Sequence, residues 1–116
     1  MVSIETEEEW RFINKEIQNR NIAEPQEWHV GLKKEQRDWK WVSGQPLTIK
    51  KWQKGQPSGD GDVVVMAKDY PADTQGLLND LRDDITKAFI CEIPKGKTRK
   101  LKLLAYKDQI RQENDT

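Results

Sequence analysis

Hydrophobic positions near the start of the chain recur at the spacing of an α-helix, which gives one apolar face. The residues on that face are Trp10, Ile13 and Ile17. Thr6, followed three residues later by Glu9, has the form of a capping box at a helix start. We therefore predict a helix from about Glu7 to Arg20. Asn21 and Pro25 are expected to end it, because asparagine tolerates the left-handed conformation and proline cannot continue the hydrogen-bond ladder.

From Trp28 onward the pattern changes to short apolar runs separated by turn residues, which predicts strands. The predicted strands are Trp28–Leu32, Trp39–Val42, Val63–Ala67 and Ala88–Ile93. Glycine and proline predict loops at Ser43–Pro46 and Gly55–Gly61. The segment Lys68–Asp84 is poor in strand signal and is also predicted to be irregular. Irregular segments this long are usually functional or disordered, so we look for a binding site in these loops.

After Pro94 the chain becomes basic and only weakly amphipathic, which predicts a stalk helix or a flexible tail. Its apolar positions, separated by Lys, Arg and Gln, are Leu101, Leu103, Leu104, Tyr106 and Ile110. We expect one folded domain over residues 1–94 and a basic linker or stalk tail over residues 95–116. A length of 116 residues suits one such domain.

Composition narrows the range of partners. The 20 basic and 20 acidic residues cancel, so the whole-molecule field does not steer the protein toward nucleic acid or an anionic membrane. We expect no nucleic-acid partner, although Trp and Lys interleave between Lys33 and Lys54, because this alternation suits a two-sided sheet as well as a nucleic-acid platform. The apolar runs are too short to span a bilayer and the acidic start lacks a secretory signal, so any membrane anchor or signal is expected outside this chain.

The chain holds a single cysteine and a single histidine, which limits its chemistry. Cys91 cannot form an internal disulfide, so it indicates either a reducing compartment or a partner outside the chain. His29 lies in a predicted core strand, where a packed side chain is more common than a catalytic base. A histidine-rich or paired-cysteine metal site is excluded by count. We therefore expect no enzymatic activity.

The motifs, taken in order, resemble the C-type lectin-like domain family. Trp28-His29-Val30-Gly31-Leu32 resembles the family's Trp-Ile-Gly-Leu strand, and Trp39-Lys40-Trp41 before Ser43-Gly44 resembles its Trp-x-Trp-x-x-Gly strand and turn. Further along, the matching segments are Trp52 before Gly55-Gln56-Pro57, Val63 to Met66 as a core strand, Asn79-Asp80 in the place of Trp-Asn-Asp, and Phe89 to Glu92 as the closing strand. The resemblance covers about residues 2–94. It implies an α+β fold with a mixed antiparallel sheet, one remaining helix and a long irregular loop region, without the family's first strand and first helix.

The resemblance also accounts for the lone cysteine. In the family, the cysteine at the position of Cys91 pairs with one in the first helix, so its disulfide partner is expected outside this chain. The places of the family's inner disulfide hold Val63 and Asp83. Because a lost disulfide typically removes about 2–5 kcal/mol, we expect the long loops to be less restrained than in most members.

Family members that bind sugar do so through calcium held by loop oxygens. By this resemblance the candidate calcium ligands are Gln56, Asp60 or Asp62, Asn79 and Asp80. The candidate ligand-binding or carbohydrate-binding residues are Gln56, Ser58, Asp60, Asn79 and Asp80. Ser58 is a poorer calcium ligand than an amide or carboxylate, and Leu78 replaces the Trp, so calcium is possible but a full calcium-dependent sugar site is not expected. The alternative for Asn79 and Asp80 is a turn pair that bonds nearby backbone, and for Asp60 and Asp62 a solvated loop.

Together these observations predict an extracellular or cell-surface recognition module that binds a protein or glycan partner through Gln53–Asp62 and Lys68–Asp84. Three alternatives stay open. The first is a calcium-dependent lectin of the galactose type, which the Gln56-Pro57 pair favours. The second is a structural ectodomain module of an adhesion or matrix protein. The third is a truncated intracellular product, for which Met1 and the lone Cys91 are the only arguments.

Overall fold

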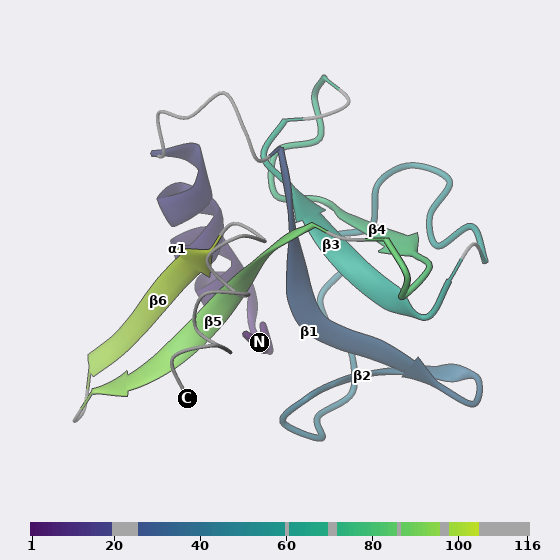
Figure 1. Cartoon of the computed structure of the whole chain (residues 1–116), viewed down its shortest axis with the longest axis horizontal. Coiled ribbons are helices and arrows are strands. Elements are labelled where there is room, and N and C mark those ends of the chain that lie inside the picture. Colours follow the sequence, from purple (N-terminus) through teal and green to yellow (C-terminus); the bar gives the residue numbers. More distant parts are fainter. Residues whose placement is uncertain (20–25, 60, 70–71, 86, 96–97, 105–116) are drawn as a thin grey trace.

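One helix and six strands follow one another in the described part of this computed structural model, which comprises residues 1–19, 26–59, 61–69, 72–85, 87–95 and 98–104 (Figure 1). The elements are α1 (Glu7–Gln18), β1 (Glu27–Glu35), β2 (Asp38–Trp41), β3 (Val63–Ala67), β4 (Leu78–Leu81), β5 (Ala88–Lys95) and β6 (Thr98–Leu104). The strands form one sheet in the order β4-β3-β1-β5-β6, and β2 pairs with the remaining length of β1. The β1–β5 pairing is parallel and the others are antiparallel, which confirms the predicted mixed sheet in an α+β fold.

The predicted helix is confirmed, and its start follows from the capping box. The Thr6 hydroxyl accepts a hydrogen bond from the Glu9 backbone N–H at 3.1 Å, and the three glutamates of the first turn complement the helix dipole. The helix ends at Gln18, where the Asn19 N–H donates to the Lys15 carbonyl at 3.0 Å. The predicted end residues Arg20, Asn21 and Pro25 lie outside the described residues. No helix in the described ranges has the length and apolar character needed to cross a membrane.

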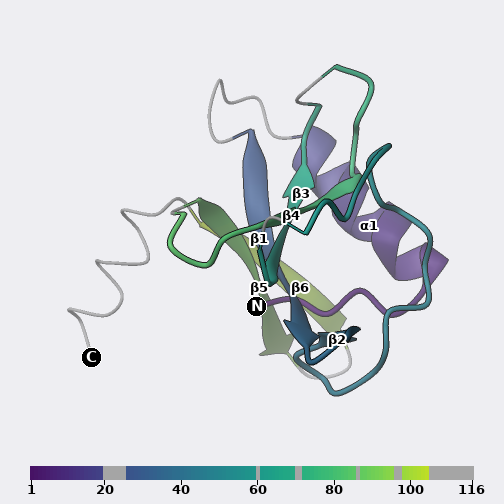
Figure 2. The same ribbon diagram turned by 90° about the vertical axis from the view of Figure 1, so that its right-hand side faces the viewer.

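The core lies between α1 and one face of the sheet, as Figure 2 shows with α1 beside β1 and β3. Fully buried core side chains are Val2, Ile4, Ile13, Ile17, Trp28, Val30, Leu32, Trp41, Val64, Met66, Leu78 and Ile90. This set includes Ile13 and Ile17 of the predicted helix face and alternate positions of the predicted strands, whereas Trp10 of that face is only partly buried and packs against the core. The apolar face of the helix and the inward-facing side chains of the strands therefore pack in one core.

Val2 is inserted between β1 and β5 and joins them where they no longer pair directly. Its N–H donates to the Ile90 carbonyl at 2.9 Å, and its carbonyl accepts from the Gly31 N–H at 2.7 Å. A Cβ at position 31 would stand only 2.7 Å from the Val2 carbonyl oxygen, so this close approach requires glycine. The Gly31 of the Trp-x-x-Gly-Leu motif is thus a packing requirement of the sheet.

The prediction that residues 68–84 are wholly irregular was wrong. Leu78–Leu81 forms β4, which pairs with β3 in the register Val64↔Asp80 and Met66↔Leu78. The segment carries little strand signal because it is short and holds Asn79-Asp80, residue types that are depleted in strands. Burial of Leu78 and pairing with β3 override that preference.

The prediction of a stalk helix or flexible tail was also wrong for residues 98–104. They form β6, which pairs antiparallel with β5 from Phe89↔Leu104 to Lys95↔Thr98. In the sequence, Leu101 and Leu103 alternate with lysines, a period that suits a strand, and the adjacent edge of β5 supplies the hydrogen-bond partners. The predicted apolar positions Tyr106 and Ile110 lie outside the described residues.

The two faces of α1 offer a direct test of this core. Replacing Ile13, whose side chain is fully buried, with alanine should lower the free energy of unfolding by about 2–5 kcal/mol, because it removes buried apolar area and leaves a cavity. The matched control is Phe12→Ala on the next residue, which is 42% exposed and should change stability by less than about 0.5 kcal/mol. Urea unfolding followed by circular dichroism measures both. Equal losses in the two variants would contradict the assigned buried face.

Candidate functional site

The loop that joins β2 to β3 returns to the outer edge of β4. The Leu78 N–H donates to the Lys51 carbonyl at 2.7 Å, and the Gln53 N–H donates to the Leu78 carbonyl at 2.9 Å. Strand-like pairing of this kind fixes residues 51–53 beside β4. Further along the same loop, Ser58 lies against Asp80 of β4.

Asp80 joins the loop to β4 through its carboxylate, which is fully buried. Oδ1 accepts hydrogen bonds from the Ser58 N–H at 2.9 Å and from the Ser58 hydroxyl at 3.1 Å. Oδ2 accepts from the Gly59 N–H at 2.9 Å. Hydrogen bonds to an ionised acceptor are about twice as strong as those between neutral groups. We call this set of contacts between Asp80 and Ser58-Gly59 the loop latch.

The latch also sets the ionisation of Asp80. Burial acts against the charged form, but the hydrogen bonds from the Ser58 and Gly59 backbone, the Ser58 hydroxyl and the Gly61 backbone together outweigh it. The pKa of Asp80 is therefore lowered from its ordinary value of 3.8. The carboxylate is ionised whenever the loop is latched at neutral pH.

Glycine permits the close approach of this loop to β4. At Gly61 a Cβ would lie 1.9 Å from the Leu81 carbonyl oxygen, so no other residue fits without moving the backbone. Gly59 has a φ of 90°, a conformation that side chains with a Cβ rarely adopt. From the sequence these glycines were predicted only as turn residues, and their role in bringing the loop close to β4 was missed. The spacing Gly59-x-Gly61 before an apolar strand was the available signal.

Two oxygen atoms of the predicted calcium set lack any hydrogen-bond partner in the part of the chain that the structure describes. They are Gln56 Oε1 and Asn79 Oδ1, and both are buried. A buried carbonyl oxygen without a donor is costly, and such an oxygen is also a ligand that calcium prefers. Gln56 and Asn79 thus fit the ligand role that the family resemblance assigned to them.

The rest of the predicted set fits calcium less well. A carboxylate offers about four lone-pair positions, and the latch hydrogen bonds already use three of those on Asp80. Asp62 is exposed, and Asp60 lies outside the described residues. Calcium takes about six to eight oxygen ligands, and the described residues provide only the two unpaired ones directly. Within those residues no group of three His, Cys, Asp or Glu is placed to hold a metal ion.

The second loop segment, which precedes β4, is attached to the helix through Trp10. The Trp10 indole Nε1–H donates to the Gly76 carbonyl at 2.7 Å. On the same ring, Lys51 Nζ lies 3.8 Å from the centroid and 2.7 Å from Glu7 Oε1. Helix α1 therefore contacts both loop segments, one through Gly76 and the other through Lys51.

The remaining residues singled out by the sequence are packed. Trp28 and Trp41 lie in the core, and the half-buried Trp39 and Trp52 meet edge to face with centroids 5.2 Å apart. His29 Nε2 lies 3.1 Å from the Ile85 carbonyl, as expected of a packed histidine. Cys91 is a free, half-buried thiol on β5.

Comparisons with known proteins agree with this geometry. A family model described as the Lectin C-type domain matches residues 1–93. Mouse (Mus musculus) layilin is 29% identical over 109 residues; the match covers 79% of this chain and 28% of layilin, so the chain spans less than a third of that relative.

Two solved structures are similar in fold. The mouse scavenger receptor C-type lectin carbohydrate-recognition domain has a TM-score of 0.55 at 28% identity, over 73% of this chain and 64% of that one. The structure titled SPL-1 - GlcNAc complex has a TM-score of 0.63 at 16% identity, over 90% of this chain and 67% of that one. The second likeness supports the fold alone.

The latch predicts a specific stability loss. Asp80→Asn removes the charge and places an NH₂ group against backbone donors, so the free energy of unfolding should fall by about 1–3 kcal/mol. Asp83→Asn is the matched control, because Asp83 is exposed and has no part in the latch. Urea unfolding at neutral pH measures both variants. A loss in the control as large as that in Asp80→Asn would contradict the assignment.

The latch should also respond to acid. Because the folded pKa of Asp80 lies below its ordinary value of 3.8, its stabilising contribution is complete above that value and is lost as the pH falls through the folded pKa. The difference in unfolding free energy between wild type and Asp80→Asn should therefore shrink as the pH is lowered from neutral to below 3.8. Urea titrations across this range provide the measurement. A difference that stays constant with pH would show that ionised Asp80 does not hold the loop.

Proposed function

Because the chain belongs to the C-type lectin domain family, we propose that it is a recognition module that binds a protein or glycan partner through its long loops. Domains of this family are generally non-enzymatic, and the proposal includes no catalysis. The proposed surface consists of residues 53–62 and the loop before β4. We further propose that binding does not require a complete calcium-dependent sugar site.

The loop latch is the observation that carries this proposal. Asp80 is one of the carboxylates that the family resemblance assigns to calcium, and here it accepts hydrogen bonds from Ser58 and Gly59. Its charge is therefore compensated by the chain itself, and the loop acquires a defined shape without a cation. A surface shaped in advance binds with less loss of conformational entropy. Lys54 and Asp62 are exposed on this loop and are available to a partner.

An extracellular or cell-surface setting is part of the proposal. Domains of the C-type lectin family typically act there, and the half-buried thiol of Cys91 fits a cysteine partner outside this chain, because disulfides persist in oxidising compartments. Any membrane anchor would likewise be supplied from outside the described residues. The structural neighbour solved with GlcNAc supports a glycan as one class of ligand by analogy of fold only.

A calcium-dependent lectin is the second candidate, and the two unpaired oxygens favour it. If a calcium ion binds, Gln56 Oε1 and Asn79 Oδ1 would hold it, with Asp60 or Asp62 as further carboxylates. The ion would supply a positive centre for sugar hydroxyl groups. In this candidate the chain's own contribution is to aim the two amide oxygens and to exclude water from them.

Asn79 separates the two candidates. Asn79→Leu replaces an amide whose oxygen lacks a donor with an apolar side chain of similar size, which is nearly neutral when nothing binds that oxygen. We expect the melting temperature of wild type and of Asn79→Leu to be nearly equal, in calcium and in EDTA, and calorimetric titration with calcium to give no heat. A calcium-dependent rise in the wild-type melting temperature that Asn79→Leu abolishes would overturn the main proposal in favour of the second candidate.

Recognition through the loops can be tested on cells. We expect the fluorescently labelled chain to bind the surface of some lines in a panel and to keep binding in EDTA. A charge swap on the loop, Lys54→Glu with Asp62→Lys, should weaken binding by about tenfold or more because both side chains are exposed there. The matched control is Lys15→Glu with Glu16→Lys on the exposed side of α1. Equal loss in the control would exclude the loops as the binding surface.

A further inference from the structure

Trp10, a half-buried residue of α1, contacts both segments of the proposed binding surface. We call residues 51–59 the first loop segment and residues 72–77 the second loop segment. The Trp10 indole Nε1–H donates to the Gly76 carbonyl of the second segment at 2.7 Å. The Lys51 ammonium group of the first segment lies 3.8 Å from the centroid of the same ring. One side chain of the helix thus joins two segments that are remote from each other in sequence.

The contact with Gly76 leaves little freedom, because the backbone packs directly on the indole. Gly76 has a φ of 73°, and a Cβ at this position would stand 2.7 Å from Trp10 Cζ2. The Gly76 N–H donates to the Ala67 carbonyl at 2.7 Å, and the Leu77 N–H donates to the Thr74 carbonyl at 2.9 Å. The second segment is therefore closed against the ring, and a movement of the indole disturbs the same turn.

The contact with Lys51 is also fixed at more than one point. Lys51 Nζ lies 2.7 Å from Glu7 Oε1, and Glu7 stands three positions before Trp10 on the same face of α1. The Lys51 side chain is only 19% exposed, and cation–π attraction grows as an ammonium group loses water. The Lys51 carbonyl accepts from the Leu78 N–H at 2.7 Å, so the backbone that carries the ammonium group is itself held. A change in the first segment therefore reaches the face of the indole.

We infer that Trp10 is a positioning residue that couples the two loop segments, so that they open and close together. The ring is oriented by the Lys51 ammonium group on its face and by the Gly76 carbonyl at its nitrogen. Loss of either contact lowers the cost of rotating the ring and thereby weakens the other contact. Segments that open as one unit are also ordered as one unit, so a partner that holds the first segment gains an ordered second segment.

A second connection between the segments runs through β4. This strand follows the second segment directly, and its Leu78 pairs with Lys51 and Gln53 of the first segment. Coupling through that pairing would need no side chain from α1. The two routes differ in Trp10→Phe, which keeps an aromatic ring for the Lys51 ammonium group and removes the N–H that holds Gly76. The influence of Lys51 on the second segment should disappear in this variant only if the coupling passes through Trp10.

Amide hydrogen exchange of the full 116-residue chain, followed by NMR on ¹⁵N-labelled protein, measures the opening of each segment. The reporters are the Gly76 and Leu77 amides, because both N–H groups donate to backbone carbonyls. Lys51→Met removes the ammonium group and keeps an apolar stem. We expect it to speed exchange at both reporters by about three- to thirtyfold, a range that follows from the strength of a cation–π contact. In the Trp10→Phe background the same substitution should change their exchange by less than about twofold.

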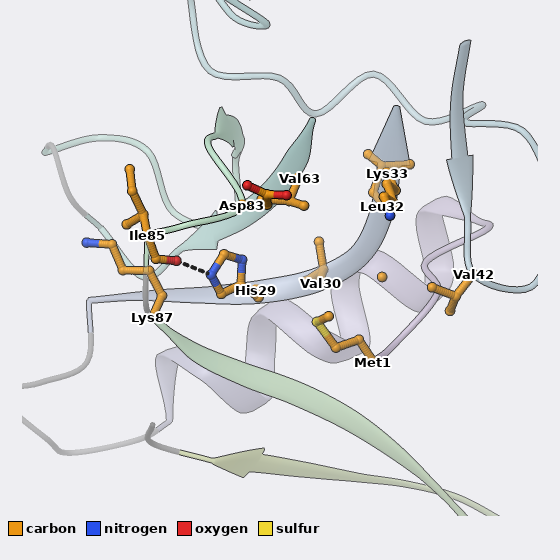
Figure 3. Close-up of a pocket in the computed structure, with 11 residues that line it drawn as sticks. Met1, His29, Val30, Leu32, Lys33, Val42, Val63, Asp83, Ile85 and Lys87 are labelled. Carbon is orange, nitrogen blue, oxygen red and sulfur yellow. Dashed lines mark hydrogen bonds between the residues drawn. The ribbon is translucent and has the colours of Figure 1, made fainter. Parts of the chain in front are cut away.

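Lys50→Met is the matched control, because Lys50 is the exposed neighbour of Lys51. It should leave the exchange of both reporters unchanged. The Val42 amide is the internal reference, since its N–H donates to the Gly31 carbonyl at 2.7 Å. Val42 and Gly31 line the pocket drawn in Figure 3, and Trp10 does not. Exchange at Val42 should stay that of the wild type in every variant.

Three results would overturn the inference. One is exchange at Gly76 and Leu77 that Lys51→Met leaves unchanged. Another is equal acceleration by Lys51→Met with and without Trp10→Phe, which would assign the coupling to β4. The last is equal acceleration at Val42, which would indicate a general loss of stability.

Only the identity of the binding surface rests on the proposed function, because the coupling is measured in the free protein. Absent cell binding with intact coupling would contradict the proposed function alone. Cell binding with absent coupling would contradict the role of Trp10 alone.

Discussion

A buried carboxylate must be given hydrogen-bond donors, and this requirement at Asp80 determines how the binding end of the protein is built. Asp80 faces inward from β4, and the donors come from Ser58 and Gly59, which precede it by 22 and 21 residues. The loop must therefore cross β4 closely, which is why Gly61 cannot carry a side chain. The backbones of Lys51 and Gln53 also pair with Leu78 of β4. The shape of the long loop follows from this pairing together with the hydrogen bonds of Asp80.

The sequence predicted those parts of the fold that depend on neighbours along the chain. Thr6 and Glu9 gave the helix start because the capping interaction is local, and the apolar run at Val63 gave β3 with its observed bounds. β4 was missed because Leu78–Leu81 becomes a strand only through pairing with β3 and through loop donors that are remote in sequence. β6 was missed for a similar reason, since its pairing partner is an edge of β5 and the local composition is that of a basic linker.

At the candidate site, too, the sequence predicted some features and missed those that depend on contacts between residues remote in sequence. The family resemblance named Ser58 and Asp80 as parts of one site, and hydrogen bonds do join these two residues; the binding role of the full set Gln56, Ser58, Asp60, Asn79 and Asp80 stays a prediction. The resemblance did not show which of these side chains are hydrogen-bonded within the chain. Asp80 is bound by the chain itself, whereas the oxygens of Gln56 and Asn79 remain without donors. A family motif thus locates the candidate binding residues, and their hydrogen bonds within the chain decide which of them can still bind a ligand.

The attachment of Trp10 to both loop segments has a practical consequence. Its indole N–H is bonded to the Gly76 carbonyl, and a lysine ammonium lies over its ring. The emission of an indole depends on its hydrogen bonding and on nearby charge. A ligand that shifts either loop should therefore change the fluorescence of Trp10, so this fluorescence reports on ligand binding at the loops.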